Sequence, residues 1–229
     1  MQETSALYKE LLETPGCRKE IAVEIAGELY GEDRIILLNT YPRLFRSNKL
    51  EAGCAVASEL HMVIRGHKII PNAAELIPMY RLRVGDTASE WIKKGIYYIY
   101  TREPNDEVNT LSIVAFDAMV RGDAIWIPDQ SLVFPMSMRS AALIISNLMG
   151  VELENPQDIS DRYLVDYPAN DWTQRNVLQF IAAAHGGNFL MTDLGKLRLL
   201  TLNTMPEESN NLVNHFGSVI TFGGVAIRV

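Results

Sequence analysis

Several segments among about the first 120 residues have hydrophobic residues at every second position, and this period constrains the fold more than any other feature. Ile21, Val23 and Ile25 alternate with polar or small neighbours, and the alternation returns over 60–64 and 80–84. A period of two sends successive side chains to opposite faces, so these segments predict half-buried β-strands. Further strands are expected over 35–38, 96–100 and 111–116, with the polar stretch 102–110 as the hairpin connection between the last two.

Two regions have the period of a helix instead, the N-terminal segment and the part of the chain beyond about residue 127. Apolar side chains there recur at three- and four-residue spacings, which predicts amphipathic helices. Capping residues mark their ends, because Ser favours the position before a helix and Gly the position after it. The expected helices are Ser5–Glu13, the segment from its cap Ser137 to Gly150, and the segment from Asp171 to the pair Gly186 and Gly187.

These elements predict an α+β fold with an antiparallel, barrel-like β module and a smaller α/β module. We expect the β module to span residues 1–127 and the α/β module, with two helices and a hairpin, to span 128–205. Residues 206–229 are expected to be a strand segment that returns to the first module. Because this alternating stretch ends without a polar tail, we expect that the chain is truncated in mid-strand or that a partner covers its β edge.

The charge balance argues against one class of function. The chain has 28 acidic and 21 basic residues, a net charge of −7, whereas binding to nucleic-acid phosphates needs a surplus of Lys and Arg. No apolar run reaches the ~20 residues that span a bilayer, and the N-terminus lacks the features of a signal peptide, so we expect a protein made in the cytoplasm. Cys17 and Cys54 are too few for a disulfide framework and are expected to be structural thiols.

A search for catalytic and metal-binding motifs finds none. The sequence contains no GxSxG, GxxxxGK, HExxH, GxGxxG or CxxC motif. His61 and His67 have the spacing of one strand face, but Gly66 interrupts the alternation and no third ligand is near, so zinc binding is disfavoured. His185 and His215 are isolated in the sequence. We therefore expect no catalytic residue, no cofactor site and no metal site.

Two further clusters favour structural roles. Glu103, Asp106 and Glu107 surround Pro104 and Asn105, a composition typical of a solvated turn rather than of an acid–base or calcium site. The second cluster is the glycine-rich stretch 186–188. It follows a helix C-terminus, whose dipole repels phosphate, so helix capping is favoured over a phosphate cradle.

Aromatic residues gather on one expected strand, at Tyr97, Tyr98 and Tyr100. Stacking on nucleic-acid bases would need an accompanying basic groove, which is missing from this stretch, so a packed strand surface is favoured. Tyr and Trp are also enriched at protein interfaces. A contact role for these tyrosines and Trp91 is therefore the alternative interpretation.

Four phrases occur in a fixed order along most of the chain: LEAGCAVASEL at 50–60, EWIKKGIYYIYTRE at 90–103, TLSIVAFDAM at 110–119 and TQRNVLQFIAAAHGGNFLMTDLGKLRLL at 173–200. Their order and spacing resemble the N-terminal region of tail hub proteins of bacteriophages and prophages. This family includes the tail-associated lysins of long-tailed phages. None of the phrases is a catalytic signature, so the resemblance rests on the series. Residues 220–229 also look like a strand that continues into further hub domain.

The resemblance implies a virion structural protein at the tail tip, the baseplate hub. Hubs of this kind combine β-barrel-like modules with an α/β insertion, and three copies form a ring that joins the tail tube to the distal tip. The implied partners are itself as a homotrimer, tail-tube and distal tail proteins, and DNA that passes through the lumen without specific binding. Membrane insertion by this segment is not implied, and assembly would take place in the bacterial cytoplasm.

The lytic domains of tail-associated lysins lie downstream of the hub, and no part of this sequence matches them. The expectation is therefore that the chain is not an enzyme, with any lytic activity in domains beyond residue 229.

Two other functions are alternatives. A peptidoglycan hydrolase or endopeptidase would have to assemble its site from scattered residues such as His185, Asp193 and Asp117. A receptor- or glycan-binding tail module would need an aromatic platform beside polar groups. The tryptophans available for such a platform are Trp91, Trp126 and Trp172.

Overall fold

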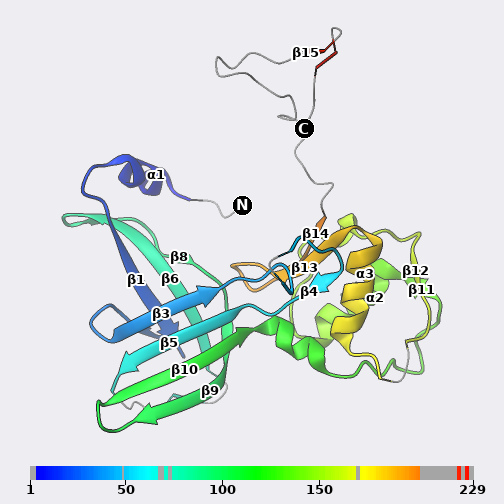
Figure 1. Cartoon of the computed structure of the whole chain (residues 1–229), viewed down its shortest axis with the longest axis horizontal. Coiled ribbons are helices and arrows are strands. Elements are labelled where there is room, and N and C mark those ends of the chain that lie inside the picture. Colours follow the sequence, from blue (N-terminus) through cyan, green and yellow to red (C-terminus); the bar gives the residue numbers. More distant parts are fainter. Residues whose placement is uncertain are drawn as a thin grey trace.

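The structure, a computed structural model, describes residues 4–47, 49–66, 70–71, 74–168, 171–201, 221–222 and 225–226. A large antiparallel sheet forms one side of the molecule, and helices α2 and α3 lie on the other (Figure 1). The predicted α+β class is confirmed. The large sheet is not closed into a barrel, because its strand order runs from one edge strand, β2, to another, β3. Among the described residues no helix is both long and apolar enough to cross a bilayer.

The large sheet has the strand order β2-β1-β6-β9-β10-β5-β3, and β7 and β8 add to β6. Each of the seven strands along this path contributes to one buried cluster, and a smaller cluster involves Ala22 of β1 with Ile77 and Met79 of β6. The sequence predicted the six longer strands β1, β3, β5, β6, β9 and β10, but it did not predict the short strands β2, β7 and β8. The strands are β1 (Arg18–Ile25), β2 (Glu28–Tyr30), β3 (Ile35–Tyr41), β5 (Glu59–Arg65), β6 (Glu75–Val84), β7 (Thr87–Ala88), β8 (Ile92–Lys93), β9 (Tyr97–Asn105) and β10 (Thr110–Asp117).

The β9–β10 hairpin is longer than predicted. The stretch 102–110 was expected to be the connection, but β9 continues to Asn105 and β10 begins at Thr110. The extra length comes from cross-strand pairing, in which Pro104 lies opposite Leu111 and Glu103 opposite Ser112. Turn-forming residue types are a local preference, and pairing with a neighbouring strand overrides that preference here.

Helix α1 (Ala6–Glu13) packs on β6 as an N-terminal cover of the sheet. The helix begins one residue later than the predicted Ser5, because Ser5 is its N-cap and the Tyr8 N–H donates to Ser5 Oγ at 3.0 Å. Ser5 also ties the helix to the segment between β7 and β8, where its N–H donates to Glu90 Oε1 at 2.8 Å. The hydroxyls of Tyr8 and Tyr80 are 3.2 Å apart.

The other unit packs two helices against a three-stranded sheet. In this sheet β14 pairs with β13, and β13 pairs in parallel with the short strand β4. A second large core lies between these elements. The elements are β4 (Cys54–Ala55), the 3₁₀ helix η1 (Ala118–Asp123), β11 (Met136–Ser137), α2 (Met138–Leu148), the 3₁₀ helix η2 (Pro156–Asp158), β12 (Leu164–Val165), α3 (Gln174–Ala184), β13 (Gly187–Met191) and β14 (Leu197–Thr201).

The predicted helix ends agree with the structure. Ser137 Oγ accepts from the Ser140 N–H at 3.1 Å, which caps α2. Helix α3 begins with a capping box between Thr173 and Asn176. After α3 the chain turns at Gly186, whose φ of +60° is the left-handed conformation that favours glycine.

The two units are not consecutive along the chain, because segments next to the strands of the large sheet pack in the helical core. Ala55 and Ala57, which lie before β5, pack in the helical core together with Met119 and Trp126. The module boundary at 127/128 and the third segment, 206–229, stay predictions. Of that last segment the structure describes β15 (Thr221–Phe222), which pairs antiparallel with β16 (Val225–Ala226), and the other residues of 206–229 lie outside the described ones.

Candidate assembly surface

His185, the histidine of the hydrolase alternative, is held by hydrogen bonds on both ring nitrogens. Nδ1 lies 2.8 Å from the Ile181 carbonyl, and Nε2 accepts from the Ser160 N–H at 2.9 Å. Because a carbonyl only accepts, the neutral ring carries its proton on Nδ1. His185 is also the C-cap of α3, and its ring packs edge-on against Tyr163. These contacts give His185 a structural role.

The two aspartates of the same alternative serve different elements. Asp117 is buried and caps η1, accepting from the Ser58 N–H at 2.9 Å and the Met119 N–H at 3.0 Å. Burial raises the pKa of Asp117, and these N–H groups oppose that rise because they favour the carboxylate. Asp193 accepts from Lys94 Nζ at 2.9 Å. No hydrogen bond in the described part of the chain joins His185, Asp117 and Asp193 to one another.

The histidine pair considered for zinc is not assembled in the described residues. His61 lies on β5, packs edge-on against Tyr41 and lies 3.5 Å from a Glu59 oxygen. His67 and His215 lie outside the described residues. Across the residues that are described, no three His, Cys, Asp or Glu side chains are placed to hold a metal ion. The cysteines Cys17 and Cys54 are both free thiols.

The tyrosines of β9 have three different environments. Tyr97 is buried, and desolvation, followed by the negative charges of Asp117 and Asp193, raises its pKa to about 12. The ring of Tyr98 lies 4.0 Å below the Arg121 guanidinium. Tyr100 is 73% exposed and packs edge-on against Phe116. Tyr100 is therefore the member of this group that is available for contacts.

Asn188, in the glycine-rich stretch after α3, connects two strands that are far apart in the sequence. Its Oδ1 accepts from the Cys54 N–H at 2.7 Å, and its Nδ2 donates to the Glu51 carbonyl at 2.8 Å. The capping interpretation of this stretch agrees with the structure. The bond between β4 and β13 was not predicted, because neither residue shows a local signal for a partner so distant in the chain.

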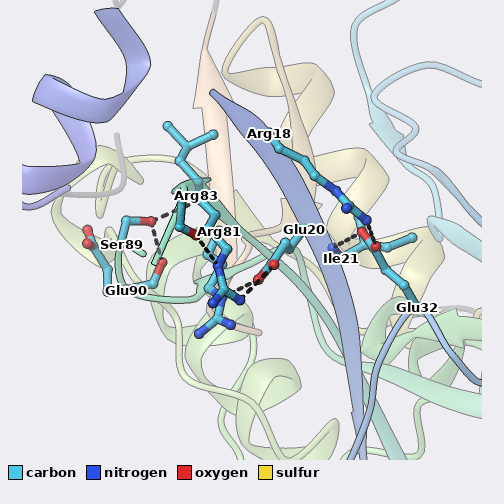
Figure 2. Close-up of polar contacts among 10 residues, drawn as sticks. Arg18, Glu20, Ile21, Glu32, Arg81, Arg83, Ser89 and Glu90 are labelled. Atoms are coloured by element: carbon cyan, nitrogen blue, oxygen red, sulfur yellow. Dashed lines mark hydrogen bonds and ion pairs between the residues drawn. The ribbon is translucent and has the colours of Figure 1, made fainter. Parts of the chain in front are cut away.

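A charged network covers the outer face of β1 and β6 (Figure 2). Glu20 accepts from Arg81 Nε at 2.7 Å and from Arg83 Nη1 at 3.1 Å. These arginines lower the pKa of Glu20, with Arg81 the larger cause. Arg81 also lies 4.5 Å from the centre of the Trp91 ring, so this tryptophan is covered by a cation.

The free edge of β1 beside this network is capped by a side chain. Glu32 pairs with Arg18, and its Oε1 accepts from the Ile21 N–H at 3.3 Å (Figure 2). A carboxylate that takes up a backbone N–H in this way blunts the edge against pairing with another chain. Glu20 and Glu32 therefore find their charge partners, Arg81, Arg83 and Arg18, within the chain.

The opposite edge strand, β3, carries exposed apolar side chains. In the described part of the chain β3 pairs with β5 and with no other strand. Ile36, Leu37 and Tyr41 are exposed, and the strand IILLNTY contains no charged residue. Proteins usually protect such an edge with charges or prolines, so this strand is suited to being covered in an assembly.

A second exposed apolar patch lies on the loops that flank α2 and α3. Ile127 and Val133 are 82% and 79% exposed, and the exposed Tyr167 belongs to an aromatic chain with Phe134 and the buried Trp126. The Trp126 N–H donates to the Trp172 carbonyl at 2.9 Å. Two of the three tryptophans thus meet, but the buried indole of Trp126 supports the patch from below and does not form a platform.

Sequence reasoning missed both apolar surfaces. A short apolar run such as 35–38 predicts a strand, but its place at a sheet edge depends on long-range pairing. The loop patch has no periodic pattern at all. Its signal in the sequence is limited to apolar residues between Pro128 and Pro135, which would otherwise be expected to be a polar connection.

The chain was compared with protein-family models, curated protein sequences and solved structures. No protein-family model matches the chain, and no curated protein sequence is similar to it. Solved structures do match. A 43 kDa tail protein of prophage MuSo2 from Shewanella oneidensis aligns with a TM-score of 0.52 over 80% of this chain, at 13% identity. The chain has the fold of prophage tail proteins.

Two further tail proteins show the same similarity. The tail protein from Neisseria meningitidis MC58 aligns with a TM-score of 0.52 over 79% of this chain, at 15% identity. Prophage tail protein gp18 from Listeria monocytogenes EGD-e aligns with a TM-score of 0.50 over 86% of this chain, at 8% identity. This chain spans 56%, 50% and 55% of the Shewanella, Neisseria and Listeria proteins.

Proposed function

We propose that this protein is a structural component of a phage or prophage tail, located at the tail tip as the baseplate hub. The observation that carries the proposal is the shared fold, since three tail proteins, two of them from prophages, align with about four fifths or more of the chain. At 8–15% identity the similarity concerns the fold, so the place at the tip and the hub role belong to the proposal.

In this role the chain assembles with itself into a ring of three copies that joins the tail tube to the distal tip. The exposed edge strand β3 and the apolar loop patch support self-association, because each leaves large apolar side chains in water in a single copy. A ring also needs contacts between different faces of neighbouring copies, so that the assembly closes. Tail-tube and distal tail proteins are the further partners.

The ring would surround DNA without binding its phosphates tightly. A chain with a net charge of −7 lacks the surplus of basic residues that neutralises phosphates. We propose no catalytic role for these residues. The side chains from which a hydrolase site would have to be built, His185, Asp117 and Asp193, are engaged in capping contacts and an ion pair.

The experiment is a measurement of mass and shape. Multi-angle light scattering on the purified chain over a range of concentrations is expected to show a trimer in equilibrium with the monomer, and negative-stain electron microscopy is expected to show rings. A strict monomer at the highest concentration reached would contradict self-assembly by these residues. Incubation with purified cell walls is the matched control, and release of soluble fragments would favour the hydrolase.

A further inference from the structure

The β9–β10 hairpin ends in a projecting acidic tip, defined as residues 103–109 with Glu103, Asp106 and Glu107. Every residue of the tip is exposed, and Val108 has 65% of its surface accessible. Figure 1 shows this end of the hairpin on the side of the sheet away from α2 and α3. The tip therefore presents one apolar side chain among carboxylates.

Hydrogen bonds hold the acidic tip in one conformation. The Glu107 N–H donates to Asn105 Oδ1 at 3.2 Å, and the Gly66 N–H at the end of β5 donates to the Asn109 carbonyl at 2.8 Å. A loop that is ordered before it binds loses less conformational entropy on docking. The tip is therefore built as a rigid projection.

A basic loop lies between β3 and β4, defined as the described residues 42–47 and 49–50 with Arg43, Arg46 and Lys49. All three cationic residues are exposed, and Leu50 has 73% of its surface accessible. Arg43 pairs with Glu59, whereas within the described residues neither Arg46 nor Lys49 forms an ion pair. Because the chain as a whole is acidic, this concentration of basic residues stands out.

An apolar cleft adjoins the basic loop at the junction of the two units. It has a volume of about 580 Å³, and Arg43 forms part of its wall. Tyr100, Phe116 and Val120 provide apolar lining, and Tyr100 is largely exposed to solvent. The charged groups of the lining form ion pairs with one another, Arg43 with Glu59 and Arg175 with Asp123. Together the loop and the cleft offer positive charge beside an apolar hollow. The acidic tip is complementary to this surface, because it presents negative charges around one apolar side chain, Val108.

The tip and the loop lie at opposite ends of the sheet. Strand register places Tyr41, which precedes the loop, opposite Glu59, and Glu59 opposite Phe116. At the other end Arg65 lies opposite Thr110, which begins β10 beside the tip. The six residue steps from Thr110 to Phe116 cover ~20 Å at the rise of a β-strand, so the two surfaces of one copy do not meet.

We propose that the acidic tip of one copy docks on the basic loop and apolar cleft of a second copy, with Val108 entering the cleft. The charge complementarity and the placement of the two surfaces at opposite ends of one chain point to this occupant. Such a head-to-tail contact closes into a ring when the rotation between copies allows it. The inference rests on the proposed self-assembly and assigns its contact.

Charge reversal on the full chain tests the contact. The variant Glu103→Lys/Glu107→Lys and the variant Arg46→Glu/Lys49→Glu each place like charges at the contact, and light scattering is expected to show at least a tenfold weaker self-association. A chain with all four changes restores opposite charges and is expected to recover assembly. Glu10→Lys/Glu13→Lys on exposed positions of α1 is the control for net charge and is expected to assemble like the unmodified chain.

Three outcomes separate this contact from the proposed function. If the unmodified chain assembles and both reversals assemble equally well, the contact is wrong and the assembly stands. If the reversals abolish assembly and the fourfold variant does not recover it, the charge pairing is wrong. If the unmodified chain stays monomeric, both proposals fail. Circular dichroism and the thermal midpoint of each variant show that a loss of assembly is not a loss of folding.

Discussion

At the scale of single residues, the chemistry-bearing side chains of this protein serve as structural connections. Asp117 and His185 cap helices, and Asn188 joins two strands. Residue types alone do not separate such roles from catalysis, because a histidine or aspartate suits both. The geometry separates them, since each of these groups has its hydrogen-bonding capacity directed at backbone atoms.

The network around Glu20 predicts a pH-dependent contribution to stability. Arg81 and Arg83 lower the pKa of Glu20 in the folded chain below its ordinary value of 4.5. A carboxyl group whose folded-state pKa is lowered stabilises the fold above its unfolded-state pKa and loses that effect as the pH falls through the folded-state value. Glu20→Gln is therefore expected to lower the urea midpoint at neutral pH, with a difference that disappears in acid.

Glu24→Gln is the matched control for this prediction, because Glu24 lies on the same strand and forms no ion pair within the described residues. It is expected to leave the difference between neutral and acid pH as in the unmodified chain. An effect of Glu20→Gln that persists undiminished in acid would contradict the prediction, since protonated Glu20 no longer carries the charge that the arginines bind.

At the scale of elements, periodicity predicted the long strands and the helices, and it failed for short elements. The strands β1 and β5 and the second half of β6, residues 80–84, follow a clear period of two, whereas 76–79 is a continuous apolar run. Ser137 and Gly186 mark helix ends through their capping chemistry. Strands of two or three residues, such as β2 and β4, are too short to show a period. They exist because neighbouring segments already provide a partner edge, which local sequence does not encode.

The connection between β4 and β13 gives the element-scale prediction. Asn188→Ala removes the partners of the buried Cys54 N–H and of the Glu51 carbonyl. Unsatisfied buried polar groups cost stability, so urea unfolding is expected to show a loss of about 2 kcal/mol. Asn147→Ala, on an exposed position of α2, is the control and is expected to change stability by less than about 0.5 kcal/mol.

A loss at Asn188 no larger than that of the control would mean that the short strand β4 is held by its packing and not by the side-chain amide. In that case Ala55 in the helical core would be the main anchor of the segment.

At the scale of the whole molecule, the two cores are connected by short segments next to the strands of the large sheet. Residues of these segments pack in the helical core. Ala57 packs in the helical core and lies two residues before β5, while Met119 packs there two residues after β10. The strands of the β unit are thus anchored at one end in the helical unit. This arrangement argues for cooperative unfolding of both units.

The prediction is a single unfolding transition seen by two probes. In the variant Trp126→Phe/Trp172→Phe, the fluorescence of Trp91 reports on the large sheet, and the helical circular dichroism reports mainly on α2 and α3. The two signals are expected to change at the same urea concentration. Both substitutions lie in the helical unit and lower its stability, so two independent units would show clearly separated midpoints. Separate midpoints would show that the units unfold independently.

The parallel pairing of β4 with β13 also bears on how the protein is made. Cys54 and Asn188 are 134 positions apart, so β4 leaves the ribosome long before its partner strand has been translated. Translation proceeds at ~5–20 residues per second, which leaves β4 without its strand partner for many seconds. The first half of the chain therefore cannot complete its native contacts as an independent early fold. Final structure formation awaits the emergence of the β13–β14 hairpin, and a ribosome-bound chain halted before that hairpin would remain sensitive to protease around β4.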